Sequence, residues 1–265
     1  MRIGIDQSSF SFEDVMLVIK QLILFLLLLQ FLGCKREEPA DQITNPITAT
    51  ALQQIALYKT NVPEPSGLFY NSKTKTLFTV SDGNSSVYEM DLSGSIIRSF
   101  LIPSSDMEGI AFSANSDTMY VAEETNQLIT KYLANGTKLY SFPVNVATLV
   151  SHGPEGVALN TTNNHVFVIN ERDPCMLLEY INKTEVKRKQ INYTLDCSDI
   201  FYDQQLDCLW LVSDESKQIA KMNTSGDLLA LYTLPITKME GITIIQDKIY
   251  VINDSTNELY VFQKP

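Results

Sequence analysis

Short apolar runs separated by polar turn residues fill the chain from Ala49 to its C-terminus. No stretch of this part keeps apolar residues at the three-to-four-residue spacing of a long amphipathic helix. Runs of this length, bounded by Gly, Asn, Ser and Asp, are typical of β-strands joined by tight turns. We therefore expect an all-β fold for residues 49–265.

The strand pattern repeats five times. Each unit opens with a small loop motif before an apolar strand, and this motif returns every 42 to 47 residues. A second motif, an aromatic residue followed by aliphatic residues and an acid, comes 14 to 16 residues later. A period in the low forties with about four short strands is typical of a β-propeller blade. The opening motifs are Pro65–Leu68, Met107–Ile110, Pro154–Val157, Cys197–Ile200 and Met239–Ile242, and the second motifs are Phe78–Asp82, Tyr120–Glu124, Phe167–Glu171, Trp210–Asp214 and Tyr250–Asp254.

The last unit has only three strands before the chain ends at Pro265. A fourth strand is available at the other end of the repeat, in Gln54–Lys59, and pairing it there would close the ring. We therefore predict a five-bladed β-propeller with four-stranded blades, in which an N-terminal strand completes the last blade.

The N-terminal region has the features of a secretory signal. Leu22–Leu29 is an apolar run of eight residues, too short to span a bilayer, and Met16 is a plausible true start. Phe31–Cys34 resembles a bacterial lipobox, in which Cys34 becomes the lipidated first residue; an ordinary signal peptide ending near a cysteine is the alternative. The predicted organisation is a signal peptide (1–33), a lipidated Cys34 with a polar tether (34–48) and the propeller (49–265).

The composition narrows the function. Lys and Arg number 20 against 31 Asp and Glu, which gives a formal net charge of −11 and argues against nucleic-acid binding. Two His and four Cys leave little room for a zinc site. The aromatic residue of each second motif recurs at one register, so we expect these five side chains in the core between blades.

Both motifs place carboxylates at the same rim of the propeller. The inner strand of a blade starts where the second strand ends, so eight acids converge on one mouth of the channel. Carboxylates that lie close together in a partly desolvated site stay ionised only beside a cation; otherwise some of their pKa values rise. Ca²⁺ is the expected cation, because it accepts oxygen ligands in irregular geometry. For Asp82 and Asp214 we expect a solvated turn or a loop cap, because their blades lack the partner Glu. The predicted metal ligands are Glu108, Glu155, Glu240, Glu124, Glu171 and Asp254; a metal-free ring with raised pKa values remains the alternative.

Three further features lie near this rim. His152 could serve as a general base, although the sequence shows no second group to orient it. Glu171 and Arg172 could form an internal ion pair instead of a metal site. Cys175 and Cys197 fall in loops of adjacent blades and are a candidate disulfide in an oxidising compartment, whereas Cys208 and His165 belong to the opposite end.

Three segments carry a family resemblance: Glu108–Ala111 (Glu-Gly-Ile-Ala), Asn170–Pro174 (Asn-Glu-Arg-Asp-Pro) and Leu209–Ser216 (Leu-Trp-Leu-Val-Ser-Asp-Glu-Ser). With the lipid anchor, they resemble the SdiA-regulated family of bacterial envelope proteins, which is distantly similar to NHL-repeat propellers. The resemblance implies a five-bladed propeller that holds calcium, and it implies no enzymatic activity. Ser66 and Ser198 stand where the other blades have Glu, and Asp199 stands in place of Gly, so the metal ring would be asymmetric.

The sequence thus favours a lipid-anchored, calcium-binding binding or scaffold module of the cell envelope. We expect it in the outer membrane, facing the periplasm or the cell surface, held to the membrane through Cys34. An unidentified protein or small molecule would bind its acidic face. The alternative is a calcium-dependent hydrolase, similar to a lactonase or a phosphoesterase, that uses the channel metal and His152.

Overall fold

The computed structural model describes residues 47–265, together with Met16 and Lys20. The predicted signal peptide, Cys34 and nearly all of the predicted tether lie outside the described residues. Ile47–Pro265 is a compact unit with its own core, so it can be produced and studied by itself. Within the described residues, no helix has the length and apolar character needed to cross a membrane.

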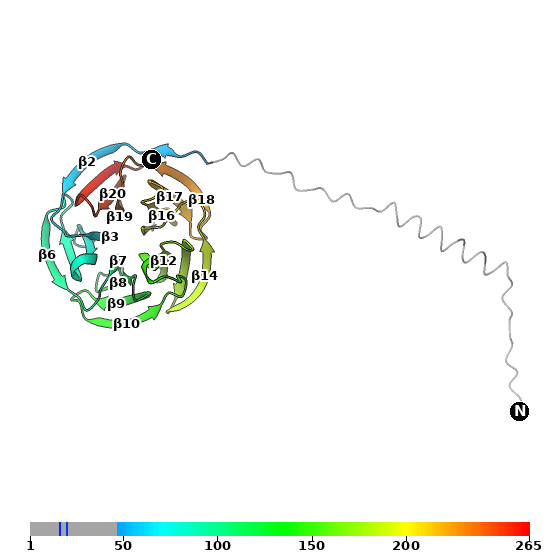
Figure 1. Cartoon of the computed structure of the whole chain (residues 1–265), viewed down its shortest axis with the longest axis horizontal. Helices are drawn as coiled ribbons and strands as arrows, with labels where there is room; N and C mark the ends of the chain where they lie inside the picture. The colour runs from blue at the N-terminus through cyan, green and yellow to red at the C-terminus, as the bar shows by residue number, and fades with distance from the viewer. Residues whose placement is uncertain (1–15, 17–19, 21–46) are drawn as a thin grey trace, which may run out of the picture. The chain divides into compact units, whose positions relative to one another are not determined.

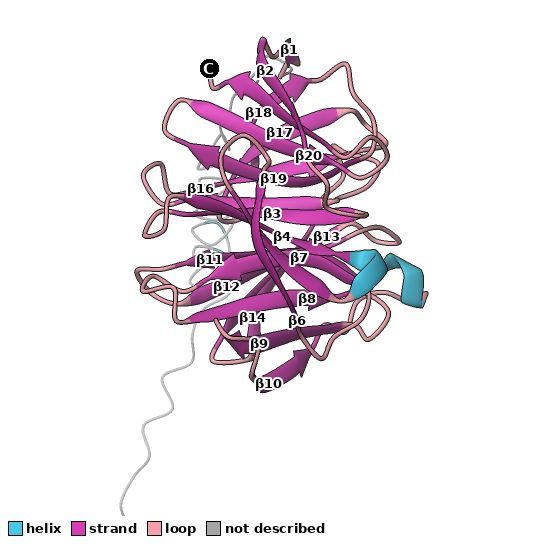
Figure 2. Cartoon of the chain, turned by 90° about the vertical axis from the view of Figure 1, so that its left-hand side faces the viewer, coloured by secondary structure: helices cyan, strands magenta, loops and turns pink. Residues whose placement is uncertain are grey.

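Five β-sheets are arranged in a ring, as Figure 1 shows, which confirms the predicted five-bladed propeller. Figure 2 shows the strands from the side. Blade 1 contains β3 (Pro65–Asn71), β4 (Thr76–Ser81), β5 (Ser86–Met90) and β6 (Ile96–Leu101). Blade 2 contains β7 (Met107–Phe112), β8 (Thr118–Glu123), β9 (Leu128–Leu133) and β10 (Lys138–Pro143), and blade 3 contains β11 (Pro154–Asn160), β12 (His165–Asn170), β13 (Met176–Ile181) and β14 (Thr184–Gln190). Blade 4 contains β15 (Asp199–Asp203), β16 (Cys208–Ser213), β17 (Gln218–Asn223) and β18 (Leu228–Thr233), and blade 5 contains β19 (Met239–Ile245), β20 (Lys248–Asn253) and β21 (Glu258–Gln263).

The N-terminal strand closes the ring as predicted. β2 (Gln54–Lys59) pairs antiparallel with β21, with Leu57 opposite Tyr260, and so becomes the fourth strand of blade 5. Two short 3-10 helices, η1 (Asp82–Asn84) and η2 (Val150–His152), were not predicted. One strand was not predicted either: β1 (Thr50–Ala51) adds a fifth, parallel strand to blade 4, beside β18. Two residues carry too little pattern to be recognised as a strand. The segment before the first full blade therefore holds blades 4 and 5 together.

The core lies between the blades. The second strand of each blade is buried almost throughout because a neighbouring blade covers each face of the sheet, which is why these strands read as continuous apolar runs. Five hydrophobic clusters fill the five interfaces between blades. The recurring aromatic residues belong to this core, as predicted, each 6% exposed or less: Phe78, Tyr120, Phe167, Trp210 and Tyr250.

Candidate metal centre at the channel mouth

A β-bulge turns one glutamate of each of three blades toward the channel. The pairing of β7 with β8 shifts between Met107 and Gly109, which leaves Glu108 opposite no residue. The same shift occurs around Glu155 in β11 and around Glu240 in β19. A bulge of this kind bends the strand and re-aims the extra side chain. The Glu-Gly pair seen in the sequence is therefore the bulge itself.

The glycine after each glutamate is required by close packing around the axis. A Cβ on Gly109 would lie 2.6 Å from the carbonyl oxygen of Glu155, and one on Gly241 would lie 2.6 Å from the carbonyl carbon of Gly67. Such distances exclude any side chain unless the backbone moves. Four glycines and Asp199 thus form a narrow ring at the floor of the mouth, and blade 4 starts without a bulge.

Asp199 closes this ring. Its Oδ2 accepts hydrogen bonds from the backbone N–H of Leu68 (3.2 Å) on blade 1 and of Ile242 (2.9 Å) on blade 5. Burial raises the pKa of the Asp199 carboxyl well above its ordinary value, although backbone hydrogen bonds oppose the shift. The residue that departs from the glycine pattern therefore links three blades.

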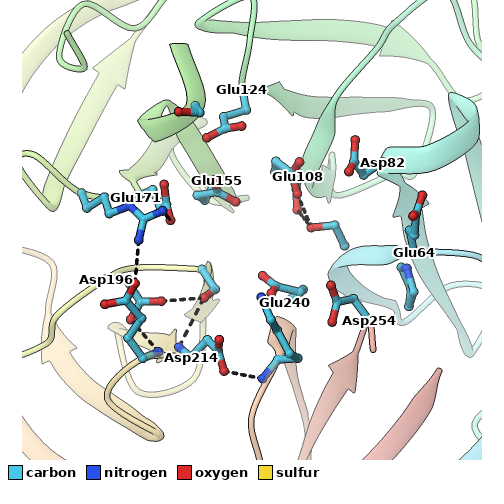
Figure 3. A pocket seen from close by; sticks show the side chains of 17 residues that line it. Glu64, Asp82, Glu108, Glu124, Glu155, Glu171, Asp196, Asp214, Glu240 and Asp254 are labelled. Atoms are coloured by element: carbon cyan, nitrogen blue, oxygen red, sulfur yellow. Dashed lines mark hydrogen bonds and ion pairs between the residues drawn. The ribbon is translucent and has the colours of Figure 1, made fainter. Parts of the chain in front are cut away.

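Above the ring lies a cavity of about 350 Å³, shown in Figure 3. All eight acids predicted at the rim line it: Asp82, Glu108, Glu124, Glu155, Glu171, Asp214, Glu240 and Asp254. Glu64, Asp196 and Glu215 also line it and were missed. Its basic lining residues are Arg172 and Lys238, so the cavity is strongly acidic.

Two of these missed acids, Glu64 and Asp196, had a signal in the sequence, and Asp106, which was also missed, shares it. Glu64, Asp106 and Asp196 each stand two residues before an opening-motif residue, in the loop that enters a blade. Glu64 and Asp106 have positive φ values of 41° and 56°, a left-handed conformation in which non-glycine residues are uncommon. An acid at this loop position in three of five repeats could have been counted as a third motif.

Two groups of carboxylates have oxygen atoms within 4.8 Å of one another, close enough to share a metal ion. One group is Glu124, Glu155 and Glu171, all of which were predicted as ligands. The other combines the predicted ligand Glu108 with Asp82 and Asp106. The predicted ligands Glu240 and Asp254 line the cavity but belong to neither group.

Burial is the main reason why these carboxyl groups resist ionisation. It raises the pKa of Glu155 well above its ordinary value, and neighbouring carboxylates raise it further. Burial also raises the pKa of Glu108 to about 8, although the Ser66 hydroxyl donates a 2.6 Å hydrogen bond to this carboxylate, which lowers the pKa. The pKa of Glu240 rises to about 8 for the same reason. Without a cation, the folded mouth therefore holds protons near neutral pH.

The two acids expected to act as turns or caps behave differently. Asp214 caps a loop, because its Oδ1 accepts the backbone N–H of Lys238. Asp82 is exposed, but it lies in the group with Asp106 and Glu108. Burial and the neighbouring Asp106 raise the pKa of Asp82 to about 6.

Arg172 forms an ion pair with Glu171, and the pair leaves one carboxylate oxygen available. Its guanidinium lies 3.2 Å from Glu171 Oε1 and 2.6 Å from Glu215 Oε1 of blade 4. Glu171 Oε2 is buried and has no hydrogen-bond partner. The ion pair and the carboxylate group therefore occur together, although the sequence presented them as alternatives. Burial still raises the pKa of Glu171 to about 7.

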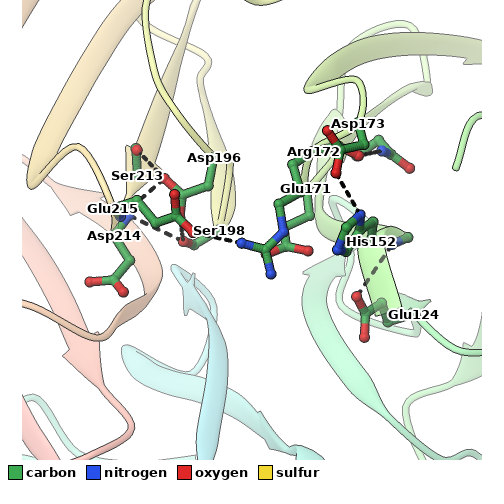
Figure 4. Close-up of polar contacts among 12 residues, drawn as sticks. Glu124, His152, Glu171, Arg172, Asp173, Asp196, Ser198, Ser213, Asp214 and Glu215 are labelled. Atoms are coloured by element: carbon green, nitrogen blue, oxygen red, sulfur yellow. Dashed lines mark hydrogen bonds and ion pairs between the residues drawn. The ribbon is translucent and has the colours of Figure 1, made fainter. Parts of the chain in front are cut away.

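His152 lies close to a carboxylate that the sequence did not reveal. Its Nδ1 lies 2.9 Å from Asp173 Oδ2, as Figure 4 shows, but the two groups are not aligned for a hydrogen bond. The side chain of His152 is largely buried. The next residue, Gly153, donates its backbone N–H to Glu124 Oε1 at 3.3 Å. The histidine therefore sits beside the Glu124–Glu155–Glu171 group.

The structure places Cys175 and Cys197 as a disulfide between blades 3 and 4, with their Cα atoms 6.1 Å apart. Cys208 is buried at the start of β16 and is not part of this disulfide. His165 is partly exposed, with Nδ1 2.5 Å from Glu179 Oε1. The disulfide thus fixes the loops beside the mouth.

Comparison with known proteins agrees with this architecture. A solved chain in a nidogen–laminin complex superposes with a TM-score of 0.59 at 15% identity, covering 76% of each chain, which shows a shared fold. A streptogramin B lyase structure matches with a TM-score of 0.48 at 18% identity, over 82% of this chain and 76% of the other. The family model described as SdiA-regulated matches residues 42–195 and 181–264, which together span the propeller. The chain therefore belongs to the SdiA-regulated family.

Proposed function

We propose that the protein is a calcium-binding β-propeller that serves as a binding or scaffold module of the bacterial cell envelope. One observation carries the proposal: Glu155 is 8% exposed and lies with Glu124 and Glu171 in a single group of oxygen ligands. No ion pair in the described part of the chain involves Glu155. A buried carboxylate without a basic partner is costly unless it is protonated or binds a cation.

The donor set fits calcium. Three carboxylates offer up to six oxygens, and Ca²⁺ takes six to eight oxygen ligands in flexible geometry, whereas Mg²⁺ needs a near-ideal octahedron. None of the described residues that line the cavity is His or Cys, the ligands that transition metals prefer. Glu171 Oε2 and Asp254 Oδ1 are buried oxygens without hydrogen-bond partners.

The surrounding residues hold these ligands in place. Arg172 binds one oxygen of Glu171, and the backbone N–H of Gly153 binds one oxygen of Glu124. The bulge in β11, at the floor of the mouth, directs the Glu155 side chain into the cavity. A bound cation would offset the mutual repulsion of these carboxylates and so fix the loops that surround the mouth. Those loops would then present a rigid acidic surface to a protein or a small molecule.

The location is proposed on the sequence alone. A lipid on Cys34 would hold the chain to a membrane, with the polar residues 34–48 as the tether and the outer membrane as the expected site. The acidic mouth would repel phosphate backbones, so we propose no nucleic-acid partner. Mass spectrometry of the full chain made in a bacterium would test the anchor, because lipidation adds acyl mass to a peptide that starts at Cys34.

Thermal unfolding of residues 47–265 tests the cation site. We expect Ca²⁺ added after EDTA to raise the Tm and Mg²⁺ to raise it less. At 100 times Kd the gain is about 2.7 kcal/mol, which corresponds to roughly 5–11 °C for a domain of this size. Glu155→Gln should lose the gain, whereas Glu185→Gln, on the exposed strand β14, should keep it. An equal gain in both variants would contradict the proposal.

A second function is favoured by the contact between Asp173 and His152. A histidine with a carboxylate nearby and a metal site beside it has the surroundings of a general base, and a cation bound there would polarise the carbonyl or phosphoryl oxygen of a substrate. In such a calcium-dependent hydrolase, Asp173 would hold the ring of His152 in place. Turnover of a lactone or phosphoester panel that His152→Ala abolishes and His165→Ala preserves would favour this function. If no compound of the panel is turned over, the hydrolase function is contradicted and the binding or scaffold module stands as the proposed function.

A further inference from the structure

The loop between β12 and β13, Glu171–Cys175, brings one member of the Glu124–Glu155–Glu171 group to the mouth, and we call it the ligand loop. At its start, the backbone N–H of Glu171 donates to the carbonyl oxygen of Gly153 at 2.9 Å. At its end, Cys175 is bonded to Cys197, in the loop that enters blade 4. The disulfide therefore anchors the end of the ligand loop to the neighbouring blade.

A chain of polar contacts also joins the ligand loop to the loop that enters blade 4 (Figure 4). Arg172 Nη1 lies 2.6 Å from Glu215 Oε1, and the backbone N–H of Glu215 donates to Asp196 Oδ1 at 3.1 Å. Asp196 is 4% exposed and also accepts a hydrogen bond from the Ser213 hydroxyl. Because Cys197 follows Asp196 directly in the chain, the disulfide and these contacts together form a closed ring that includes the ligand loop.

Both sulfurs of the disulfide are shielded from solvent. Cys197 is fully buried and Cys175 is 7% exposed. The Thr194 hydroxyl lies 3.8 Å from Cys197 Sγ and 4.0 Å from Cys175 Sγ. A thiol reductant can therefore reach either sulfur only when one of the two loops moves. Since Glu171 belongs to the ligand loop, a movement of that loop displaces Glu171 from the other two carboxylates of its group.

Preorganisation connects the disulfide with the affinity for a cation. Glu171 Oε2 is buried without a hydrogen-bond partner, and the folded ligand loop holds this side chain beside Glu124 and Glu155. When the disulfide is opened, the ligand loop loses the anchor at its end, and binding of a cation must then order the loop again. This ordering cost lowers the affinity although every carboxylate of the group is still present.

We propose that the disulfide between Cys175 and Cys197 controls the cation affinity of the mouth, so that the site binds Ca²⁺ more tightly with the disulfide closed than with two thiols. The inference rests on the proposed cation site and adds redox control to it. Reduction breaks the S–S bond: a dithiol transfers two electrons and two protons to the sulfurs and becomes a disulfide itself. Coupling at equilibrium is reciprocal, so bound Ca²⁺ stabilises the disulfide by the same factor.

Calcium titration of residues 47–265 tests the proposal, with the Kd as the readout. We expect the double variant Cys175→Ser/Cys197→Ser to bind Ca²⁺ about three- to tenfold more weakly than wild type, which corresponds to the cost of ordering about one side chain. The matched control is Cys208→Ser, which makes the same exchange at a buried position at the opposite end of the propeller and should leave the Kd unchanged. Cooperative thermal unfolding in EDTA would show that each variant is folded.

A redox titration of wild type measures the reciprocal effect without any cysteine variant. In a buffer of reduced and oxidised dithiothreitol, saturating Ca²⁺ should raise the ratio of disulfide to dithiol protein about three- to tenfold over the ratio in EDTA. In Glu155→Gln, Ca²⁺ should leave this ratio unchanged.

Two kinds of failure can be told apart. If wild type binds Ca²⁺ but the double variant binds it equally well, or Cys208→Ser weakens binding as much, the redox inference is overturned and the proposed cation site stands. A redox ratio that Ca²⁺ does not change in wild type that binds Ca²⁺ would overturn it as well. Wild type that binds no Ca²⁺ would contradict both the cation site and its redox control.

Discussion

Asp199 offers a test of how the floor of the mouth is held together. Replacing it with glycine gives blade 4 the residue found at the same place in the other four blades. The change removes the carboxylate that accepts the backbone N–H groups of Leu68 and Ile242, and it leaves the backbone free to follow the same path. Because these partners belong to blades 1 and 5, their loss should weaken the interfaces where the ring closes.

The magnitude follows from the two lost acceptors. A buried N–H left without a partner costs about 1–3 kcal/mol, so two such groups would cost about 2–6 kcal/mol. Burying the Asp199 carboxylate has a desolvation cost, and this cost is the reason why its pKa is raised. Removing the carboxylate removes that cost and so offsets part of the loss. We expect a net loss of about 2–4 kcal/mol in the free energy of unfolding, or roughly 4–16 °C in Tm for a domain of this size.

Urea unfolding of residues 47–265 measures this loss, with Asp199→Asn as the companion variant. Asparagine keeps the size and one carbonyl acceptor, so its loss should lie between those of wild type and Asp199→Gly. An unfolding free energy for Asp199→Gly within about 0.5 kcal/mol of wild type, or above it, would refute the reasoning. Such a result would mean that the desolvation cost of the Asp199 carboxylate is at least as large as the stabilisation from its two hydrogen bonds.

The remaining predictions concern protonation, the disulfide and the glycine ring. In EDTA, the free energy of unfolding should fall as pH rises from about 4.5 to about 8, because folding raises the pKa values of Glu108 and Glu240 and the folded state then binds more protons than the unfolded state. Urea unfolding at three pH values measures this, and a flat profile would contradict it. Breaking the 22-residue disulfide loop with Cys175→Ser should lower the unfolding free energy by about 3 kcal/mol; dithiothreitol should lower the Tm of wild type but not that of the variant. Gly109→Ala should cost about 1–3 kcal/mol, because its Cβ meets the backbone of blade 3. Gly83→Ala is its control, since a Cβ there meets only the flexible Glu64 side chain, and equal losses would count against the close-packed ring.

Most of the fold could be predicted from the sequence because the strand pattern repeats. Strands buried on both faces must be apolar throughout, so the second motif marked the same strand in every blade. The unfinished last unit and the unassigned strand at residues 54–59 together required ring closure, which β2 and β21 form. The convergence of the eight acids followed from the antiparallel order of the first two strands.

The features that could not be predicted depend on loops and on contacts between blades. Asp173 and His152 belong to different loops, and no spacing rule relates them. Arg172 reaches Glu215 of the next blade, a contact set by the packing of blade 3 on blade 4. The sequence showed Asp199 only as a departure from glycine, because its partners are backbone groups 131 and 43 residues away.

Direct measurement of calcium uptake tests the central proposal most closely. Residues 47–265, stripped with EDTA and dialysed against Ca²⁺, should bind it saturably; Glu155→Gln should lose this binding and Glu185→Gln should retain it. Wild-type protein that takes up no Ca²⁺, or a folded Glu155→Gln variant that binds as wild type does, would contradict the proposal that the acidic mouth is a cation site.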